Sequence, residues 1–302
     1  MLSANLAAQT YCELETNLSS APDFPRWAKL GSLASSALIA EARLTPKPAL
    51  VDQRGSGAHA DLNLDLMISS AHALEPFFQE MARISLGAAL STRLREQLAS
   101  CGRQAEISMY LATGGSNSHR GSIWCMGLLV ASAAMLSDTA SPEEIAQNAA
   151  SIAVIDDRYA PKEKSHGSLV KQTYGVRGAR AEAEDGFPHI TKIALPHLRQ
   201  KRLNGATETS ARLDALMSIM AELDDTCLLY RGGMEALLVA KTAAKDVLAL
   251  GGSSSSAGMA RLFQLDFDLL KLRSSPGGSA DLLAATLFLD SLSLTELSNG
   301  NA

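Results

Sequence analysis

The stretch IWCMGLLVASAAML, Ile123 to Leu136, is the longest apolar run in the chain, and it decides the fold class. Its apolar residues recur at helical spacing. The run is well short of the roughly 20 residues that a helix needs to span a bilayer, so it predicts a buried helix of a soluble protein. The same spacing recurs in seven more segments: Trp27 to Leu44, Leu62 to Ile84, Ile145 to Ile155, Leu213 to Leu223, Met234 to Leu250, Met259 to Leu272 and Asp281 to Leu294.

The composition also favours an all-α chain. Hydrophobic residues make up 46% of the 302 residues and aromatic residues only 5%, so alanine and leucine must fill most of the core. Such a core favours close-packed helices over a β-sandwich, whose strands prefer β-branched and aromatic residues. We expect one compact multi-helix domain over residues 25–302, with glycine-rich loops that form a nucleotide site, and a loosely attached arm at residues 1–24.

Charge and cysteine content narrow the functional class. The net charge of -5, with no long Lys/Arg run, argues against a nucleic-acid partner. The four cysteines form no CxxC pair, and without a secretion signal they fit a reducing compartment. Glu13 and Glu15 interrupt the apolar residues at the N-terminus, which has no cationic region and does not resemble a signal peptide. We therefore expect a cytoplasmic protein without a membrane partner.

A glycine-rich loop, TGGSNSHRG, lies between two helical patterns at residues 113–121. Gly114 and Gly115 would let backbone N–H groups approach an anion, and the N-terminus of the next helix adds positive potential. Arg120 can add a forked contact to a phosphate. The loop lacks the ending of a Walker A motif. A plain helix–helix turn with a solvated arginine explains the same residues, and spacing alone does not decide between the two.

A stiff loop, TPKPALVD followed by GAHAD, occupies residues 45–61. Its two prolines hold Lys47 away from helical geometry. We expect Asp61 and Asp65 to open the next helix at i and i+4, so that both project from one face to bind a metal ion or act as bases. The alternative is that these acids only complement the helix dipole.

Three further segments contain charged residues and glycines close together in the sequence. In GARAEAEDGFP, Arg180 and Glu184 are spaced to pair on a helix surface, whereas Glu182 has no obvious partner. Asp224 and Asp225 lie between two helices and can bind a metal ion or pair with Arg231. The segment SPGGSAD at 275–281 is either a second anion-binding turn or an N-cap turn.

Together these segments resemble the triphosphoribosyl-dephospho-coenzyme A synthase family, which serves citrate lyase and malonate decarboxylase. The matching segments TPKPALVD with GAHADL, GGSNSHRG, SHG, GARAEAEDGFP, DTCLLYRGG and SPGGSADLLAATLFL stand in the family's order. Ala49 stands where a glycine is common, while Arg120 and Cys227 replace a lysine and an asparagine of the citrate lyase branch. The GSGAH segment and the Arg-Gly after His119 are closer to the malonate decarboxylase branch.

The resemblance implies an all-helical enzyme and a reaction. ATP and 3′-dephospho-coenzyme A would give 2′-(5″-triphosphoribosyl)-3′-dephospho-coenzyme A and adenine. The product would pass to a carrier-protein transferase. Inversion at the ribose carbon would need a carboxylate, ligands for the triphosphate and Mg²⁺. The oligomeric state stays open, a homodimer included.

The resemblance also gives the residues candidate roles. For catalysis these are Asp61, Glu182 and His59, and for the metal ion they are Asp61, Asp65 and Asp225. The candidates for binding ATP and its phosphates are Lys47, Gly114, Gly115, Asn117, His119, Arg120, Arg180, Arg231, Gly232, Gly233, Ser275, Gly277 and Gly278.

Two other classes of protein fit the same residues. One is a metal-dependent N-glycosidase similar to the ADP-ribosylglycohydrolases, in which water replaces the 2′-hydroxyl. It differs from the transferase because adenine release would not require dephospho-coenzyme A. The other is a non-catalytic helical scaffold, which predicts no nucleotide binding.

Overall fold

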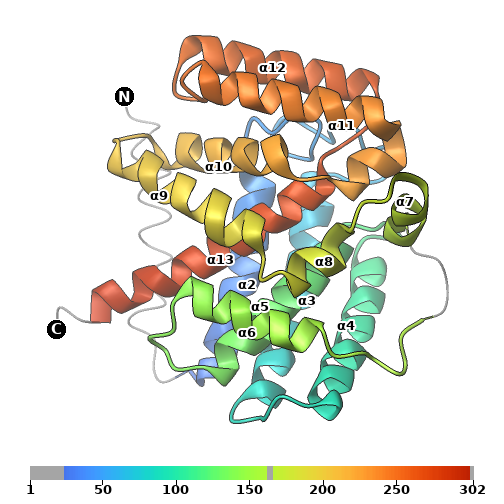
Figure 1. Ribbon diagram of the computed structural model, residues 1–302, viewed down its shortest axis with the longest axis vertical. Coiled ribbons are helices and arrows are strands. Elements are labelled where there is room, and N and C mark those ends of the chain that lie inside the picture. Colours follow the sequence, from blue (N-terminus) through green and yellow to red (C-terminus); the bar gives the residue numbers. More distant parts are fainter. Residues whose placement is uncertain (1–23, 162–165, 300–302) are drawn as a thin grey trace.

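The computed structural model describes residues 24–161 and 166–299, which form an all-α fold (Figure 1). The described residues contain no β-strand, so the predicted fold class is confirmed. The arm predicted at residues 1–24 lies, apart from Phe24, outside the described residues. The elements are α2 (Arg26–Arg43), α3 (Leu64–Ser85), α4 (Thr92–Ala112), α5 (Arg120–Met135), α6 (Pro142–Ala153), α7 (His166–Tyr174), α8 (Gly178–Glu184), the π-helix η1 (His189–Ala194), α9 (Leu195–Leu203), α10 (Glu208–Glu222), α11 (Thr226–Ala249), α12 (Ser256–Lys271) and α13 (Gly277–Asn299).

The buried helices are the ones that the apolar spacing predicted. All eight predicted segments fall on helices, with ends that differ by at most five residues, except that α11 begins eight residues before Met234. Helix α6 begins at a capping box, in which Ser141 and Glu144 satisfy each other's backbone N–H groups. Helix α4 was missed because it buries few residues along its length. Across the described ranges, no helix is long and apolar enough to cross a membrane.

Helix α13 is the central element of the core. It crosses the middle of the molecule (Figure 1) and packs against α2, α5, α10 and η1. Every residue from 282 to 290 is buried. The opposing helix α5 is buried almost throughout, because it carries the apolar run that begins at Ile123. The two helices meet at their N-terminal ends, and this contact positions the polar residues of both.

Helix α11 is broken in its first third. Gly233 has φ 65° and ψ -160°, outside the helical region, so the chain turns there and then resumes as a helix. The helical segment predicted from Met234 thus starts directly after a break within one longer element. The residues before the break face α7 and α13, and those after it pack against α12 as an antiparallel pair (Figure 1).

Two carboxylates fix the long loop between α2 and α3. Asp52 Oδ2 accepts hydrogen bonds from the Lys47 N–H at 2.8 Å and from the Thr45 hydroxyl at 3.1 Å. Asp266, on α12, accepts the Ala49 N–H at 2.7 Å and Arg54 Nη1 at 2.8 Å. Ala49 has φ 54°, a left-handed conformation that glycine adopts more easily, which explains the preference for glycine at this position.

We predict that Asp266→Ala loosens this loop while the helices stay intact. The substitution leaves the Ala49 N–H without its acceptor and should lower the free energy of unfolding by about 2 kcal/mol. Urea unfolding measures the loss, and limited proteolysis should cut residues 44–63 faster. The matched control is Asp268→Ala on the same helix, because within the part of the chain that the structure describes the Asp268 carboxylate bonds only the exposed Gln264 side chain. Equal effects from the two variants would contradict the assignment.

Candidate active site

The carboxylate of Asp225 joins the N-termini of α11 and α13. Its Oδ1 accepts the N–H groups of Cys227 at 2.8 Å and Gly278 at 3.3 Å. Its Oδ2 accepts the N–H and the hydroxyl of Ser279 at 2.8 and 2.9 Å. With four donors and 1% exposure, this side chain caps two helices at once. Of the two alternatives for these acids, the pairing with Arg231 is not formed: Asp224 pairs with Lys241 at 2.7 Å.

Glycines make this junction possible. A Cβ on Gly277 would lie 3.0 Å from Cys227 Sγ, and one on Gly278 would lie 3.0 Å from Asp225 Oδ1. A Cβ on Gly232 would lie 2.3 Å from Ser274 Oγ. These predicted phosphate-binding glycines therefore let α11 and α13 approach each other closely, and Gly233 forms the break in α11.

A cluster of Arg231, His59 and Ser275 lies at the rim of the junction. Arg231 Nη1 donates to Ser275 Oγ at 2.9 Å, and His59 Nε2 lies 3.0 Å from the same hydroxyl. Burial and the charge of Arg231 lower the pKa of His59 to about 4, so this imidazole is neutral at pH 7. Among residues 24–161 and 166–299, Arg231 has no carboxylate partner within ion-pair distance. Its charge is therefore available to an anionic ligand.

Asp61 and Asp65 do not share the first turn of a helix as expected. Helix α3 begins at Leu64, because Asn63 accepts the Leu66 N–H at 2.9 Å and caps the helix there. Asp61 lies in the preceding loop, where its side chain is 59% exposed and its Oδ1 is 3.9 Å from His59 Nδ1. Both acids remain accessible to solvent.

The GGSNSHRG loop has the geometry of a helix–helix turn. Gly114 and Gly115 have positive φ angles, and the Gly115 N–H bonds the Tyr110 carbonyl at 2.7 Å, which closes α4. Asn117 Oδ1 accepts the Arg120 N–H at 3.2 Å. The Arg120 guanidinium is held by Glu106 at 3.1 Å. The loop also reaches the neighbouring segment, since Ser116 Oγ donates to the Asp61 carbonyl at 3.1 Å.

Arg180 and Glu182 belong to two different pairs. Arg180 binds Glu184 at 2.7 Å and Asp156 at 3.0 Å on the surface, as the helical spacing allowed. Glu182 is buried and accepts the His189 N–H at 3.0 Å and Nδ1 at 2.7 Å. Burial opposes the charged imidazolium, but the hydrogen bond and charge of Glu182 outweigh it and raise the pKa of His189. Since His189 lies beyond the end of α8, helical spacing could not reveal this partner.

Lys47 is an interior residue. It is 1% exposed, and its Nζ binds Glu41 Oε1 at 2.5 Å and the Glu41 carbonyl at 2.7 Å. His119 is also buried; its Nδ1 lies 2.9 Å from Ser70 Oγ, and its Nε2 has no hydrogen-bond partner among the described residues. Burial and the charge of Lys47 lower the pKa of His119 to about 3. Before any ligand binds, the charge of Lys47 is thus neutralised by Glu41, and the imidazole of His119 is uncharged.

Asp281, expected only as part of a turn, is a further acid of the site. This half-buried carboxylate lies over the N-terminus of α5, where its Oδ1 accepts a short hydrogen bond from the Ser122 hydroxyl. A Cβ on Gly121 would collide with its Oδ2. Burial, together with the charges of Glu41 and Asp225, raises the pKa of Asp281 to about 7.

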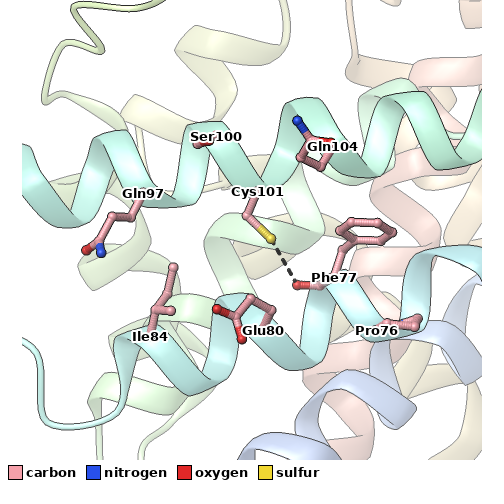
Figure 2. A pocket seen from close by; sticks show the side chains of 8 residues that line it. All are labelled: Pro76, Phe77, Glu80, Ile84, Gln97, Ser100, Cys101 and Gln104. Carbon is pink, nitrogen blue, oxygen red and sulfur yellow. Dashed lines mark hydrogen bonds between the residues drawn. The ribbon is translucent and has the colours of Figure 1, made fainter.

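Two hollows on the surface lie away from this junction. One of about 420 Å³ lies between α3 and α4 and is lined by Phe77, Glu80 and Cys101 (Figure 2). Glu80 is the charged residue in its wall, which makes it unsuited to a triphosphate. A second, mostly apolar hollow lies beside Gly114 and Gly115. Both are separate from the junction of α11 and α13.

The six motif segments converge on the junction. The contacts of Asp225, Arg231 and Asp281 described above join four of the segments. The other two segments are joined through α11: His166 stacks on Tyr230 with ring centroids 3.8 Å apart, and Gly178 lies against Thr226.

A model of the ATP:dephospho-CoA triphosphoribosyl transferase family matches residues 27–299. The chain belongs to this family. The resemblance expected from the motifs is therefore confirmed at the level of the family.

Relatives of this transferase family match nearly the whole chain. A Klebsiella pneumoniae protein named 2-(5″-triphosphoribosyl)-3′-dephosphocoenzyme-A synthase is 51% identical over 274 residues, which is 91% of this chain and 98% of that protein. An Azotobacter vinelandii protein, with the same name prefixed "Probable", is 52% identical over 266 residues, 87% of this chain and 91% of its own. No solved structure matches the chain significantly.

We predict that Asp225→Asn is strongly destabilising and Asp224→Asn is not. The amide of asparagine would turn an N–H donor toward the donors of Cys227, Gly278 or Ser279 and cost on the order of 3 kcal/mol. Asp224 forms an exposed pair with Lys241, so its loss should cost less than about 1 kcal/mol. Urea unfolding measures both. If Mg²⁺ stabilised the wild type but not Asp225→Asn, Asp225 would be a metal ligand instead of a cap.

Proposed function

We propose that this chain transfers the 5-triphosphoribosyl group of ATP to the 2′-hydroxyl of 3′-dephospho-coenzyme A and releases adenine. The observation that carries the proposal is the family match over residues 27–299, together with the convergence of the six motif segments on one junction. Three helix N-termini meet there, those of α5, α11 and α13, and their partial positive charges suit a polyphosphate.

In this proposal the triphosphate binds at the rim. Arg231 is the best-placed cation, because the neutral His59 and the Ser275 hydroxyl hold it without neutralising it. Arg120 and Arg180 are already paired with carboxylates, so a phosphate would have to displace Glu106 or Glu184. Lys47 orients the interior through Glu41 rather than meeting the substrate directly.

Magnesium would enter with ATP. The described residues contain no group of three or more His, Cys, Asp or Glu side chains placed to hold a metal ion. Mg²⁺ commonly takes only one or two carboxylates and fills its remaining positions with phosphate oxygens and water. The accessible Asp61 and Asp65 suit this role, whereas Asp225 has its oxygens occupied by four donors. The ion would neutralise charge on the triphosphate.

We further propose that the enzyme makes its product for malonate decarboxylase and not for citrate lyase. The GSGAH segment at 55–59 and the Arg-Gly after His119 favour the malonate decarboxylase branch over the citrate lyase branch. The product would then be handed to a carrier-protein transferase in the cytoplasm.

The deciding experiment is a mass spectrum of the products from ATP, Mg²⁺ and dephospho-coenzyme A. We expect free adenine and the triphosphoribosyl adduct, and neither when dephospho-coenzyme A is left out. Adenine without the acceptor would favour the N-glycosidase instead. Release of ADP or pyrophosphate would put the cleavage at a phosphate and overturn the proposal.

We predict that Arg231→Ala weakens ATP binding far more than Arg120→Ala. Removing a guanidinium that contacts phosphate costs on the order of 2 kcal/mol, roughly 30-fold in affinity. Arg120→Ala removes a surface pair with Glu106 and should change ATP affinity little. Isothermal titration with a non-reacting ATP analogue measures both. A larger loss in Arg120→Ala would move the triphosphate to the GGSNSHRG loop.

We predict that turnover requires a divalent cation. The Asp61 carboxylate lies 3.9 Å from His59 at the rim, and without a bridging ion it would repel the triphosphate. Adenine release should vanish after exhaustive chelation and return with Mg²⁺. In Asp61→Asn the Mg²⁺ concentration at half-maximal rate should rise roughly tenfold. Undiminished turnover after chelation would contradict the requirement.

A further inference from the structure

Asp281 is a carboxylate at the junction that has no cationic partner among the described residues. Glu41 is tied to Lys47, Glu182 to His189, and Asp225 to four donors. Among the described residues, Asp281 receives hydrogen bonds from the hydroxyl and the backbone N–H of Ser122. Residue 281 as a whole is of intermediate exposure, so the core does not fully enclose it.

The backbone around Asp281 is shaped to receive it. Gly121 presents only hydrogen to the carboxylate, and a Cβ at that position would collide with Oδ2. The carboxylate therefore occupies a place that any other residue at 121 would fill. Two residues before Gly121 in the chain, the Nε2 atom of the buried His119 has no hydrogen-bond partner among the described residues. An unpaired buried imidazole nitrogen is costly unless a ligand completes it.

We propose that Asp281 is the catalytic base that accepts the proton of the dephospho-coenzyme A 2′-hydroxyl. This rests on the proposed function. The C1′–N9 bond of ATP breaks, and its electron pair leaves with adenine. The 2′-oxygen forms the new bond to C1′, its proton passes to Asp281, and adenine takes one proton from water. Asp281 then returns its proton to solvent.

The electrostatic setting suits this task. A base works best when its pKa lies near the operating pH, and the pKa of Asp281 is raised to about 7. The groups that face it are Ser122 and Cys125 on α5, Glu41 on α2, and Asp225 and Cys227 at the start of α11. The acids among them disfavour a second negative charge and so favour proton uptake. The same negative surroundings stabilise the positive charge that develops on the ribose as adenine leaves.

The test is single-turnover adenine release at saturating substrates across a pH series. For the wild type we expect the rate to rise with pH through a midpoint of about 7, because the carboxylate form of Asp281 is the active one. Asp281→Asn should lose roughly 100-fold or more in rate and lose the pH dependence, while ATP still binds. The matched control is Asp290→Asn, a buried acid on the same helix that pairs with Arg202 at 2.6 Å and should keep the wild-type rate.

A second variant covers the case in which Asp281→Asn does not fold. The hydrogen bond from Ser122 favours the carboxylate, so Ser122→Ala should raise the pKa of Asp281 and move the rate profile to higher pH with an unchanged plateau. A purely structural contact would lower stability without moving the midpoint. The proposal is overturned if Asp281→Asn keeps its rate within threefold, if Ser122→Ala leaves the midpoint in place, or if Asp61→Asn or Glu182→Gln abolishes the pH dependence instead. Failure of the proposed function would look different, since the wild type itself would then form no triphosphoribosyl adduct.

Discussion

The site depends on one carboxylate, that of Asp225, which binds the first turns of two helices at the same time. Each helix begins with N–H groups that have no partner within the helix, and burying them unpaired would be costly. Asp225 satisfies donors from both α11 and α13, so neither helix can shift along its axis without breaking a charge-assisted hydrogen bond. The positions of Arg231 on one helix and Asp281 on the other follow from this constraint.

The charges are arranged from the rim inward. Arg231 lies at the rim beside a neutral histidine, while Glu41 and Asp281 lie deeper, with Lys47 as the buried cation. A substrate with a triphosphate at one end and a ribose that becomes positive at the other matches this order. The glycine-rich stretches between these residues serve mainly to let backbones approach, as the close contacts of Gly232, Gly277 and Gly278 indicate.

Much of the fold could be predicted from sequence, and less of the site. The long buried helices were predictable because their apolar residues repeat at a fixed spacing, whereas the more exposed α4 and the short α7 and α8 carry little of that signal. The motifs marked the right segments. Their partners were hidden, because contacts such as Glu182–His189 and Ser122–Asp281 join residues that no helical period relates. The sequence showed that Arg120 and Arg180 are cations within the motifs. It could not show that each one pairs with a carboxylate in the folded chain.

The absence of a side chain at position 121 makes two distant positions a single evolutionary unit. Because the Asp281 carboxylate occupies the volume of the missing methyl group, a descendant of this chain cannot gain even alanine at 121 while keeping the acid where it stands. Loss of the acid would in turn free position 121 to vary. Among chains of this fold, a larger residue at 121 should therefore occur only where the acid at 281 has moved or been lost, whereas 281 can change while 121 stays glycine.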